Sequence, residues 1–385
     1  MIRRVVSAST IGTALEWYDF MLYGTAAALV FGGVFFPKGD PLAATLASLG
    51  TFAVGFLARP VGGLLFGHLG DRYGRRFVLV VTRRGLFAAI PPTGNALGVI
   101  LATLVFTPFT WLAQDAFLSW GWRVPFLLSI LILPIGLYIR SRVDETPAFT
   151  ESVEAGERSA APVVAVLREA PGSLLKGFLV SVGPNVATYI PSVYALSYVT
   201  GNVGLAAAVA TGGLLVANTV KLVTLPLSGA LSDRFGRRPV FIAGATLCAA
   251  AAFPFFWLLD TGNPMLVWLA MVLVLTFAND LMLGAQASML PEQFPTRMRF
   301  TGVAASRELA AAAAGGTLPF IAAFLTARTQ GTWAISSLMV VMCAIAIVGA
   351  LGVKDGRDVP LGGGDAEGGE ASSALTDGAP AERAR

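Results

Sequence analysis

Charged residues are scarce in this sequence, and their scarcity decides the solvent in which the chain folds. Asp, Glu, Lys and Arg make up only 13% of the residues, against roughly 25% in a soluble globular protein. In contrast, 55% of the residues are hydrophobic, and the mean hydropathy is +0.71. So few charges cannot cover so much apolar surface in water. We therefore expect the lipid bilayer to be a partner of the whole chain.

Cysteine and histidine are almost absent. Cys248 and Cys343 both fall in apolar stretches, which argues against disulfide, redox or metal chemistry and favours a packing role. The single histidine, His68, lies in a basic loop, where a solvated side chain is expected in preference to a proton relay. We find no nucleophile–base pair, metal-ligand cluster or phosphate loop, so we predict neither an enzyme nor a bound metal or cofactor.

Long apolar stretches are abundant. Each is long enough for a helix of roughly 20 residues, which spans the hydrocarbon core. An unclosed sheet would leave backbone groups unpaired in lipid, and the alternating pattern of barrel strands is missing, so we expect an all-α polytopic membrane protein. The ten stretches are Ile11–Phe36, Leu42–Phe66, Phe87–Trp111, Ala116–Ile139, Leu174–Val199, Val203–Leu231, Val240–Leu259, Met265–Leu290, Gly302–Leu325 and Trp333–Val353.

Positive charge is placed asymmetrically along the chain. The net charge of +4 does not indicate nucleic acid, because the Lys and Arg residues fall on one side of the membrane if the helices alternate. By the positive-inside rule that side is the cytoplasm. The sequence thus predicts a multi-pass protein of the plasma membrane with both termini in the cytoplasm.

A decapeptide occurs twice and relates two parts of the chain. GHLGDRYGRR at Gly67–Arg76 returns as GALSDRFGRR at Gly229–Arg238, an offset of 162 positions. Parallel duplicated halves of this kind are common in transporters. We expect an N-terminal transmembrane half (1–139), a polar cytoplasmic linker (140–176), a C-terminal transmembrane half (177–353) and a disordered, cytoplasmic tail (354–385).

Five blocks of sequence carry a family resemblance. The repeated loops resemble the cytoplasmic loop signature of the major facilitator superfamily, and the five blocks together resemble its metabolite:proton symporter family. The resemblance implies twelve helices in two halves that rock around a central site, and transport of a small metabolite with protons. The blocks are GTALEWYDFMLYGTAAALVF (12–31), GFLARPVGGLLFGHLGDRYGRR (55–76), FLSWGWRVPFLLS (117–129), LSDRFGRRPV (231–240) and PEQFPTRMRFTG (291–302).

The first half is too short for six helices. From Arg76 to Arg140 there are 64 positions, whereas from Arg238 to Lys354 there are 116. The difference of 52 positions is the length of about two helices with their connection. We predict about ten transmembrane helices, the third and fourth of the family's twelve being missing. With them go the family's fourth-helix arginine and a glycine-rich acidic stretch.

Several ionisable residues fall inside the apolar stretches. Glu16 and Asp19 share one face of the first helix, Arg59 lies on the second, and Lys221 is Arg59 moved by the 162-residue offset. At about 1.5 Å per residue, these groups and Asp280 lie at similar depth, so they could surround one aqueous cavity. We predict that Glu16, Asp19 and Asp280 carry protons, and that Arg59 and Lys221 attract an anionic or zwitterionic substrate.

Structural roles remain alternatives for these residues. Glu16 and Asp19 could form a pair with Arg59, and Arg59 and Lys221 could snorkel towards the cytoplasmic surface. Neutral polar residues of the same region, which line the site or serve helix packing, are Asn185, Tyr189, Tyr194 and Asn279.

The repeated loops suit a mechanical role. Their glycines permit tight turns, and the pairs Asp71/Arg75 and Asp233/Arg237 resemble the charge pairs that latch the cytoplasmic side in the family. The alternative is that these arginines only fix topology. The predicted gate residues are Gly67, Gly70, Asp71, Arg72, Gly74, Arg75, Asp233, Arg234, Gly236 and Arg237.

The leading hypothesis is proton-coupled uptake of a small organic acid or zwitterion by alternating access. The rival is a membrane protein that inserts without transporting, either a remnant or a binding partner of other membrane proteins, because two helices are missing. The sequence indicates neither the metabolite nor the oligomeric state.

Overall fold

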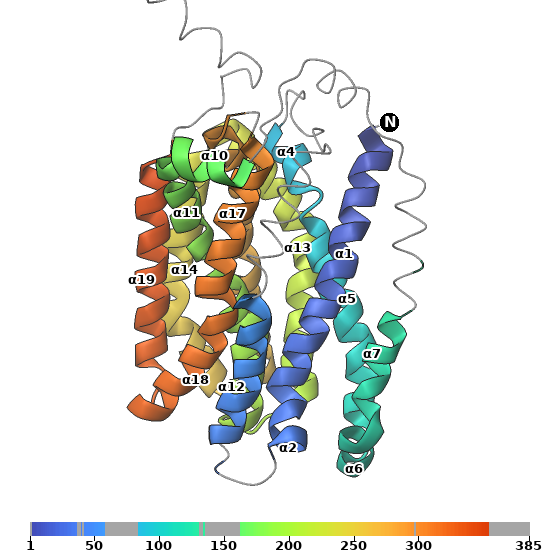
Figure 1. The fold of residues 1–385 in the computed structure, drawn as a ribbon. Helices are drawn as coiled ribbons and strands as arrows, with labels where there is room; N and C mark the ends of the chain where they lie inside the picture. The colour runs from blue at the N-terminus through green and yellow to red at the C-terminus, as the bar shows by residue number, and fades with distance from the viewer. Residues whose placement is uncertain are drawn as a thin grey trace, which may run out of the picture.

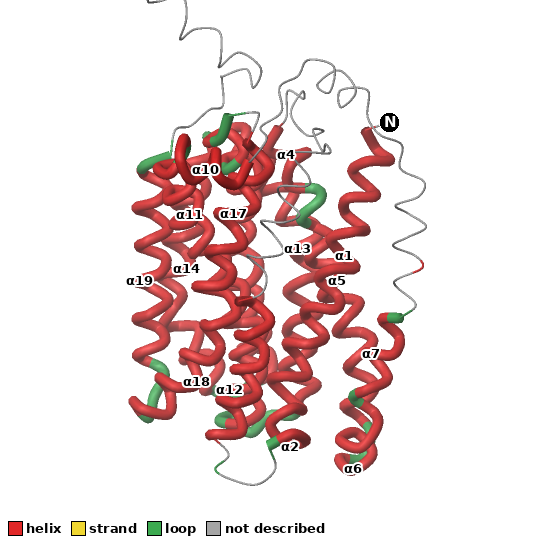
Figure 2. The backbone as a smooth tube through the Cα atoms, in the orientation of Figure 1, coloured by secondary structure: helices red, strands yellow, loops and turns green. Residues whose placement is uncertain are grey.

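The protein forms a bundle of helices, as a computed structural model of the chain shows (Figures 1 and 2). The structure describes residues 2–36, 40, 42–57, 84–130, 134, 162–295 and 298–353. Within these ranges every regular element is a helix. The all-α membrane fold predicted from the apolar stretches is therefore confirmed, because a helix satisfies its own backbone groups in lipid.

The described part of the first half contains two helical segments long enough to cross a membrane, Thr10–Phe35 and Thr93–Trp111, and several shorter helices. The first segment is continuous through α1 (Ile2–Ala26), the π-helical turn η1 (Ala27–Phe31) and α2 (Gly32–Phe35), and a second helix covers Leu42–Leu57. After the undescribed stretch come α4 (Arg84–Ala89), α5 (Thr93–Phe106), η2 (Thr107–Trp111), α6 (Gln114–Ala116), η3 (Phe117–Gly121) and α7 (Arg123–Ser129).

The second half is described almost completely. A short helix, α10 (Pro162–Glu169), precedes the first membrane segment, and the residue-176 boundary predicted for the linker falls inside α11. The elements are α11 (Pro171–Tyr189), η4 (Ile190–Tyr194), α12 (Ala195–Gly201), α13 (Ala207–Phe235), α14 (Arg237–Asp260), α15 (Pro264–Met271), η5 (Val272–Ala278), α16 (Asn279–Met289), η6 (Pro291–Gln293), α17 (Arg299–Ala311), η8 (Ala312–Gly316), α18 (Thr317–Thr329) and α19 (Trp333–Leu351).

The surface of the bundle is apolar where it meets lipid. Seven helices of the described part are long and apolar enough to cross a membrane. Large apolar side chains such as Val223, Trp257 and Val348 point outwards and are 63–70% exposed. In water such a surface would aggregate, whereas in a bilayer it faces acyl chains. The prediction of ten helices extends into residues 58–83, 131–133 and 135–161, which lie outside the described residues.

Close helix packing brings α1 against α5 and joins the halves. Gly94 and Gly98, one turn apart on α5, lie against the backbone of α1 at Thr10 and Ala14, so any side chain there would collide with that backbone. α5 in turn packs along α13, and α4 packs on α13 and α16. α13 of the second half is thus the helix on which the first half rests.

Figure 1 places the start of α1, α4 and α10 at one end of the bundle, and α2, α6 and the α18–α19 turn at the other. At the first end α10 inserts Val166 between Phe294 and Met298, which follow α16. Since α10 belongs to the predicted cytoplasmic linker, we call this the inner end of the bundle, and the opposite end the outer end.

Candidate functional site

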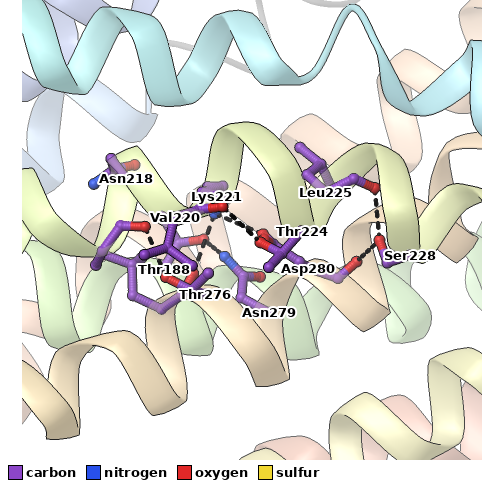
Figure 3. Close-up of polar contacts among 12 residues, drawn as sticks. Thr188, Asn218, Val220, Lys221, Thr224, Leu225, Ser228, Thr276, Asn279 and Asp280 are labelled. Atoms are coloured by element: carbon purple, nitrogen blue, oxygen red, sulfur yellow. Dashed lines mark hydrogen bonds and ion pairs between the residues drawn. The ribbon is translucent and has the colours of Figure 1, made fainter.

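An ion pair lies inside the second half, between α13 and α16. The Lys221 ammonium is 3.3 Å from the Asp280 carboxylate, and both residues are only 1% exposed (Figure 3). An isolated charge at this depth would be costly, so each group needs the other. The structure therefore brings together two residues that the sequence placed at similar depth on different helices.

A π-helical turn in front of Asp280 shapes this pair. In η5 the backbone N–H groups bond to the carbonyl five residues earlier, in place of four as in an α-helix. This pattern is found often at functional sites. Two contacts join the turn to α13: Lys221 Nζ donates to the carbonyl of Leu275 at 3.2 Å, and Thr276 Oγ1 donates to the carbonyl of Ala217 at 2.9 Å. Lys221 is thereby held by a carbonyl dipole and a carboxylate together.

Hydroxyl groups of α13 surround Asp280. Thr224 donates a hydrogen bond to the carboxylate, and Ser228 Oγ donates to the backbone carbonyl of Asp280 at 2.6 Å. Gly284 permits this approach, because a side chain there would collide with Ser228 and the backbone of Gly229. The sequence interpretation missed Thr224 and Ser228, although their spacing of three and seven from Lys221 places them on one face of a helix.

Amide side chains connect α16 to α11. Asn279 Nδ2 donates to Thr188 Oγ1 at 2.9 Å, and Gln286 Nε2 donates to Ser181 Oγ at 2.8 Å. Asn279 is fully buried, and its Oδ1 has no hydrogen-bond partner among the described residues. An acceptor left open beside the ion pair is a place where a water, a proton donor or a substrate group gains a hydrogen bond.

Aromatic rings fill the boundary between the halves. Tyr189 of α11 stacks on Trp17 of α1 with ring centroids 6.2 Å apart, and it meets Phe56 edge-on at 5.0 Å. Phe20 and Phe52 complete what we call the aromatic cluster: Trp17, Phe20, Phe52, Phe56 and Tyr189. Such packing of rings stabilises the contact of the halves in this conformation.

Two glycines of the second half receive this cluster. A side chain at Gly316 would collide with Phe56, and one at Gly315 would lie 3.0 Å from Tyr189 and 3.1 Å from Asn185. Asn185 itself donates to the carbonyl of Ser181 at 2.7 Å on its own helix. Tyr189 and Asn185 thus lie near the boundary of the halves, and Tyr189 takes part in helix packing.

Tyr194 lies nearer the outer end and serves another contact. Its hydroxyl is 2.6 Å from Thr326 Oγ1 on α18, and one turn later Tyr198 donates to Asp260 of α14 at 2.6 Å. These bonds attach the outer part of α11–α12 to the neighbouring helices. The structure does not bring Tyr194 to the ion pair.

The carboxylates of the first half differ from Asp280 in their surroundings. Glu16 and Asp19 are both exposed on α1, and Asp19 lies within hydrogen-bonding reach of the Ser129 hydroxyl on α7. Arg59, the predicted cation of this half, lies outside the described residues.

The inner end is closed between α4 and α13. Asp233 Oδ2 accepts a hydrogen bond from the backbone N–H of Leu86 at 3.0 Å, in the first turn of α4, where backbone donors lack partners. Arg237 lies 3.9 Å from Asp233 and 3.0 Å from Glu292, and Arg237 and the Glu292 side chain are almost fully buried. Glu292 was missed as a site residue because its motif, PEQF, was used only for the family resemblance.

A glycine with left-handed backbone conformation allows this arrangement. Gly236 ends α13 with φ of +98° and begins α14, so Asp233 and Arg237 meet across the turn. Arg234 instead lies over the ring of Phe235. The predicted gate residues of the first half, Gly67, Gly70, Asp71, Arg72, Gly74 and Arg75, lie outside the described residues, as does His68.

The outer end contains an open cavity between the halves. It has a volume of about 490 Å³ and is lined by η1, the end of η2, η3, α12 and the start of α13. Thr110 and Thr200 supply hydroxyls, and Leu29 and Phe117 supply apolar surface. Among the described residues, the two halves thus touch at the inner end through Asp233 and Leu86, and a cavity lies between them at the outer end.

The two cysteines take no part in the site. Cys248 and Cys343 are free and fully buried, on α14 and α19. Among the described residues no group of three His, Cys, Asp or Glu side chains is placed to hold a metal ion.

The chain is similar to known proteins over most of its length. The family model of the Major Facilitator Superfamily matches residues 82–315 and 219–375. The inner membrane metabolite transport protein YhjE of Escherichia coli is 32% identical, over 93% of this chain and 95% of that protein. The shikimate transporter of Escherichia coli is 30% identical, over 92% and 95%.

Another relative and one solved structure extend the comparison. The glycine betaine/proline/ectoine/pipecolic acid transporter OusA of Dickeya dadantii is 30% identical, over 94% of this chain and 85% of that protein. The crystal structure of a D-xylose–proton symporter aligns with a TM-score of 0.63, covering 92% of this chain and 98% of that one. Because the two sequences are only 18% identical, this structural likeness shows a shared fold alone.

Proposed function

The chain belongs to the Major Facilitator Superfamily and is a multi-pass membrane transporter rather than an enzyme, and from this premise we propose that it takes up a small organic acid or zwitterion together with protons. The uptake proceeds by alternating access, in which the two halves rock around a central site. The substrate class and the use of the proton gradient are the parts that we propose.

The observation that carries the proposal is the buried pair of Lys221 and Asp280. Ionisable residues inside a membrane span are expensive and usually mark a pathway for substrate or protons. A carboxylate can take up a proton, and an ammonium can bind the carboxylate of a substrate. Both groups lie on α13 and α16, which also contact the first half through α4.

The relatives support the substrate class. Shikimate, proline and glycine betaine, which name the transporters above, all contain one carboxylate, and the last two are zwitterions. Lys221 and the predicted Arg59 offer positive charge for the carboxylate, while Glu16 and Asp19 offer negative charge for a cationic group or a site for a proton. Asn279 and Asn185 add neutral hydrogen-bonding groups.

The closed inner end and the open outer cavity support alternating access. The contact of Asp233 with α4 and the aromatic cluster hold the halves together, and these contacts must separate when the site opens inwards. We place the inner end in the cytoplasm, with both termini, in accord with the arginines and lysines of the loops. The membrane is then the cytoplasmic membrane of the cell.

The short first half is part of the proposal. The alignment with the shikimate transporter runs over 416 positions, more than the 92% of 385 residues that this chain contributes to it. This length difference agrees with two helices missing after Arg76. It also favours a second candidate, a membrane protein that inserts but does not transport, since the fourth helix of the family would have lined the central cavity.

Uptake into proteoliposomes separates the two candidates. The full chain is reconstituted, and labelled shikimate, proline, glycine betaine and a dicarboxylate are offered under an inward proton gradient, with and without an uncoupler. The proposal predicts accumulation that the uncoupler abolishes. Folded, inserted protein that accumulates none of these probes would instead establish the inactive membrane protein.

A further inference from the structure

The Lys221–Asp280 ion pair carries no net charge, and this restricts how it can bind a proton or a charged substrate. While the pair is intact, Lys221 contacts a carboxylate and the Leu275 carbonyl, so its charge becomes available to a substrate only after Asp280 is neutralised. Adding an anionic substrate beside the intact pair would bury an uncompensated negative charge. Adding a proton alone to Asp280 would leave an uncompensated ammonium. Either event is unfavourable by itself.

We propose that Lys221 and Asp280 form one exchange switch, in which a proton taken up by Asp280 releases Lys221 to bind the carboxylate of the substrate. An O–H bond forms on the Asp280 carboxylate with a proton from the outer solution, and the ion pair to Lys221 breaks. A new ion pair forms between Lys221 and the substrate carboxylate. Lys221, Asp280 and the substrate carboxylate together are neutral after the exchange, as the pair is before it, so proton and carboxylate bind in a ratio of one to one. The cationic group of a zwitterion is balanced separately, by the negative charge of Glu16 or Asp19. This inference rests on the proposed function and assigns its coupling step.

The surroundings of the pair suit such an exchange. Thr224, whose hydroxyl donates to the ionised carboxylate, can rotate its hydroxyl and accept a hydrogen bond from the protonated acid. Asn279, the residue before Asp280 on α16, has an Oδ1 with no hydrogen-bond partner among the described residues. The protonated state therefore does not leave the buried O–H without partners.

No other ionisable group of the described neighbouring helices lies beside the pair in mid-membrane. α4 contributes only Arg84 at its start, and α5, η2, α15 and η5 contain no ionisable side chain. The remaining groups on the elements packed against α13 and α16 are Lys176 near the start of α11 and Tyr189 at its end, Tyr198 on α12, Arg237, Arg238, Cys248 and Asp260 on α14, Asp233 and Arg234 at the inner end of α13, and Glu292 on η6. The charged members of this set lie near the ends of the bundle. Among the described carboxylates of these elements, Asp280 is therefore the one that forms an ion pair with Lys221.

Motion of the halves gives the switch access to solvent. Lys221 is 1% exposed while α13 packs against α4 and α5. In the proposed alternating access, rocking of the halves would change the surface that covers α13. The flexible four-carbon stem of lysine lets its ammonium leave Asp280 without movement of the backbone. The exchange thus couples protonation of Asp280 to the relative movement of the two halves.

Calorimetry on the detergent-purified full chain counts the proton. Shikimate, proline and glycine betaine are titrated separately at constant pH in buffers of different ionisation enthalpy. The proposal predicts uptake of about one proton per bound carboxylate in the wild type. It also predicts that the methyl ester of shikimate binds at least about tenfold more weakly and without proton uptake. Wild-type binding without proton uptake would overturn the switch.

Variants locate the proton. Asp280→Asn is expected to bind its probe without proton uptake and to exchange internal for external probe in proteoliposomes, while gradient-driven accumulation falls to the level of the uncoupler control. Lys221→Met is expected to lose probe binding by at least about tenfold. Asp115→Asn, which neutralises an exposed carboxylate near the outer end, is the matched control and keeps wild-type behaviour.

The outcomes separate this inference from the proposed function. Proton uptake that persists at about one per probe in Asp280→Asn would place the proton elsewhere and refute the switch, while coupled transport by the wild type would stand. If no probe accumulates in wild-type proteoliposomes, the proposed function fails and the switch fails with it. Should Asp280→Asn not fold, the wild-type proton count and the ester comparison decide alone.

Discussion

Among the described residues, the two halves of the molecule differ in the burial of the charged side chains within their helices. In the first half Glu16 and Asp19 lie exposed on α1, and in the second half Lys221 and Asp280 neutralise each other in a packed interior. The two helices that we propose to be missing belong to the first half, where 64 positions separate Arg76 from Arg140. An ion pair completed within the second half does not depend on them. The second half thus holds the more self-sufficient part of the candidate site.

The largest expected effect follows from removing one partner of the second half's pair. Lys221→Met leaves Asp280 buried without its cation, and breaking a buried pair in this way typically costs about 3–5 kcal/mol of stability. The double variant Lys221→Met/Asp280→Leu removes both charges and should recover most of that loss. Denaturant or thermal unfolding in detergent measures both. If Lys221→Met unfolds like the wild type, the pair contributes nothing to the second half.

A change at the boundary should affect both halves together. Gly316→Ala forces Phe56 away from η8, and overpacking of this kind costs about 1–3 kcal/mol. The cost falls on the conformation that the structure shows, in which the contact exists, so the halves should separate at the inner end more often. Spin labels at the inner ends of α4 and α13 report their separation. Gly55→Ala is the matched control, because a side chain there meets nothing within 4 Å; an equal response of both variants would contradict this assignment.

The inner-end contact gives a smaller effect. Asp233→Asn removes the charge that caps the first turn of α4, and such a cap is typically worth about 0.5–2 kcal/mol. The variant should favour the inward-facing state and raise the alkylation rate of a cysteine placed at the fully buried Ala89 on α4. An unchanged alkylation rate would mean that Asp233 does not hold the halves together.

Neutralising an exposed carboxylate of the first half should affect stability least. Asp19→Asn is expected to change the free energy of unfolding by about 0.5 kcal/mol or less, as is usual for exposed positions. We nevertheless expect it to abolish proton-driven accumulation while insertion continues, because in the proposed function Glu16 and Asp19 carry protons as well as Asp280. Unfolding curves and uptake measured on the same preparation check both parts. Full proton-driven uptake in this variant would remove Asp19 from the mechanism.

The helical fold was predictable from the sequence because lipid leaves the backbone few choices. Apolar length alone located the second-half segments, and depth counted along the helices placed Lys221 and Asp280 at one level. Which way each side chain points depends on rotation of the helices and on the π-helical turn η5, and neither follows from depth. The pairing of Lys221 with Asp280, and its hydrogen bonds to Thr224 and Leu275, therefore appeared only in the structure.

Contacts between distant segments were the least predictable part. The repeat drew attention to Asp233, but its partner is the backbone of Leu86, which no side-chain pattern reveals. The packing contact of Phe56 with Gly316 joins residues that are 260 positions apart in the sequence. Small residues on one face, such as Gly94 and Gly98, were a usable signal of close helix packing.

Substrate-driven proton entry shows whether this chain moves protons together with its substrate. Proteoliposomes containing the full chain and a trapped pH-sensitive dye, with no pH gradient imposed, receive shikimate, proline or glycine betaine from outside. The account predicts that the lumen acidifies as the transported probe enters, and that an uncoupler dissipates the change. Entry of labelled probe with no acidification would contradict proton coupling by this chain.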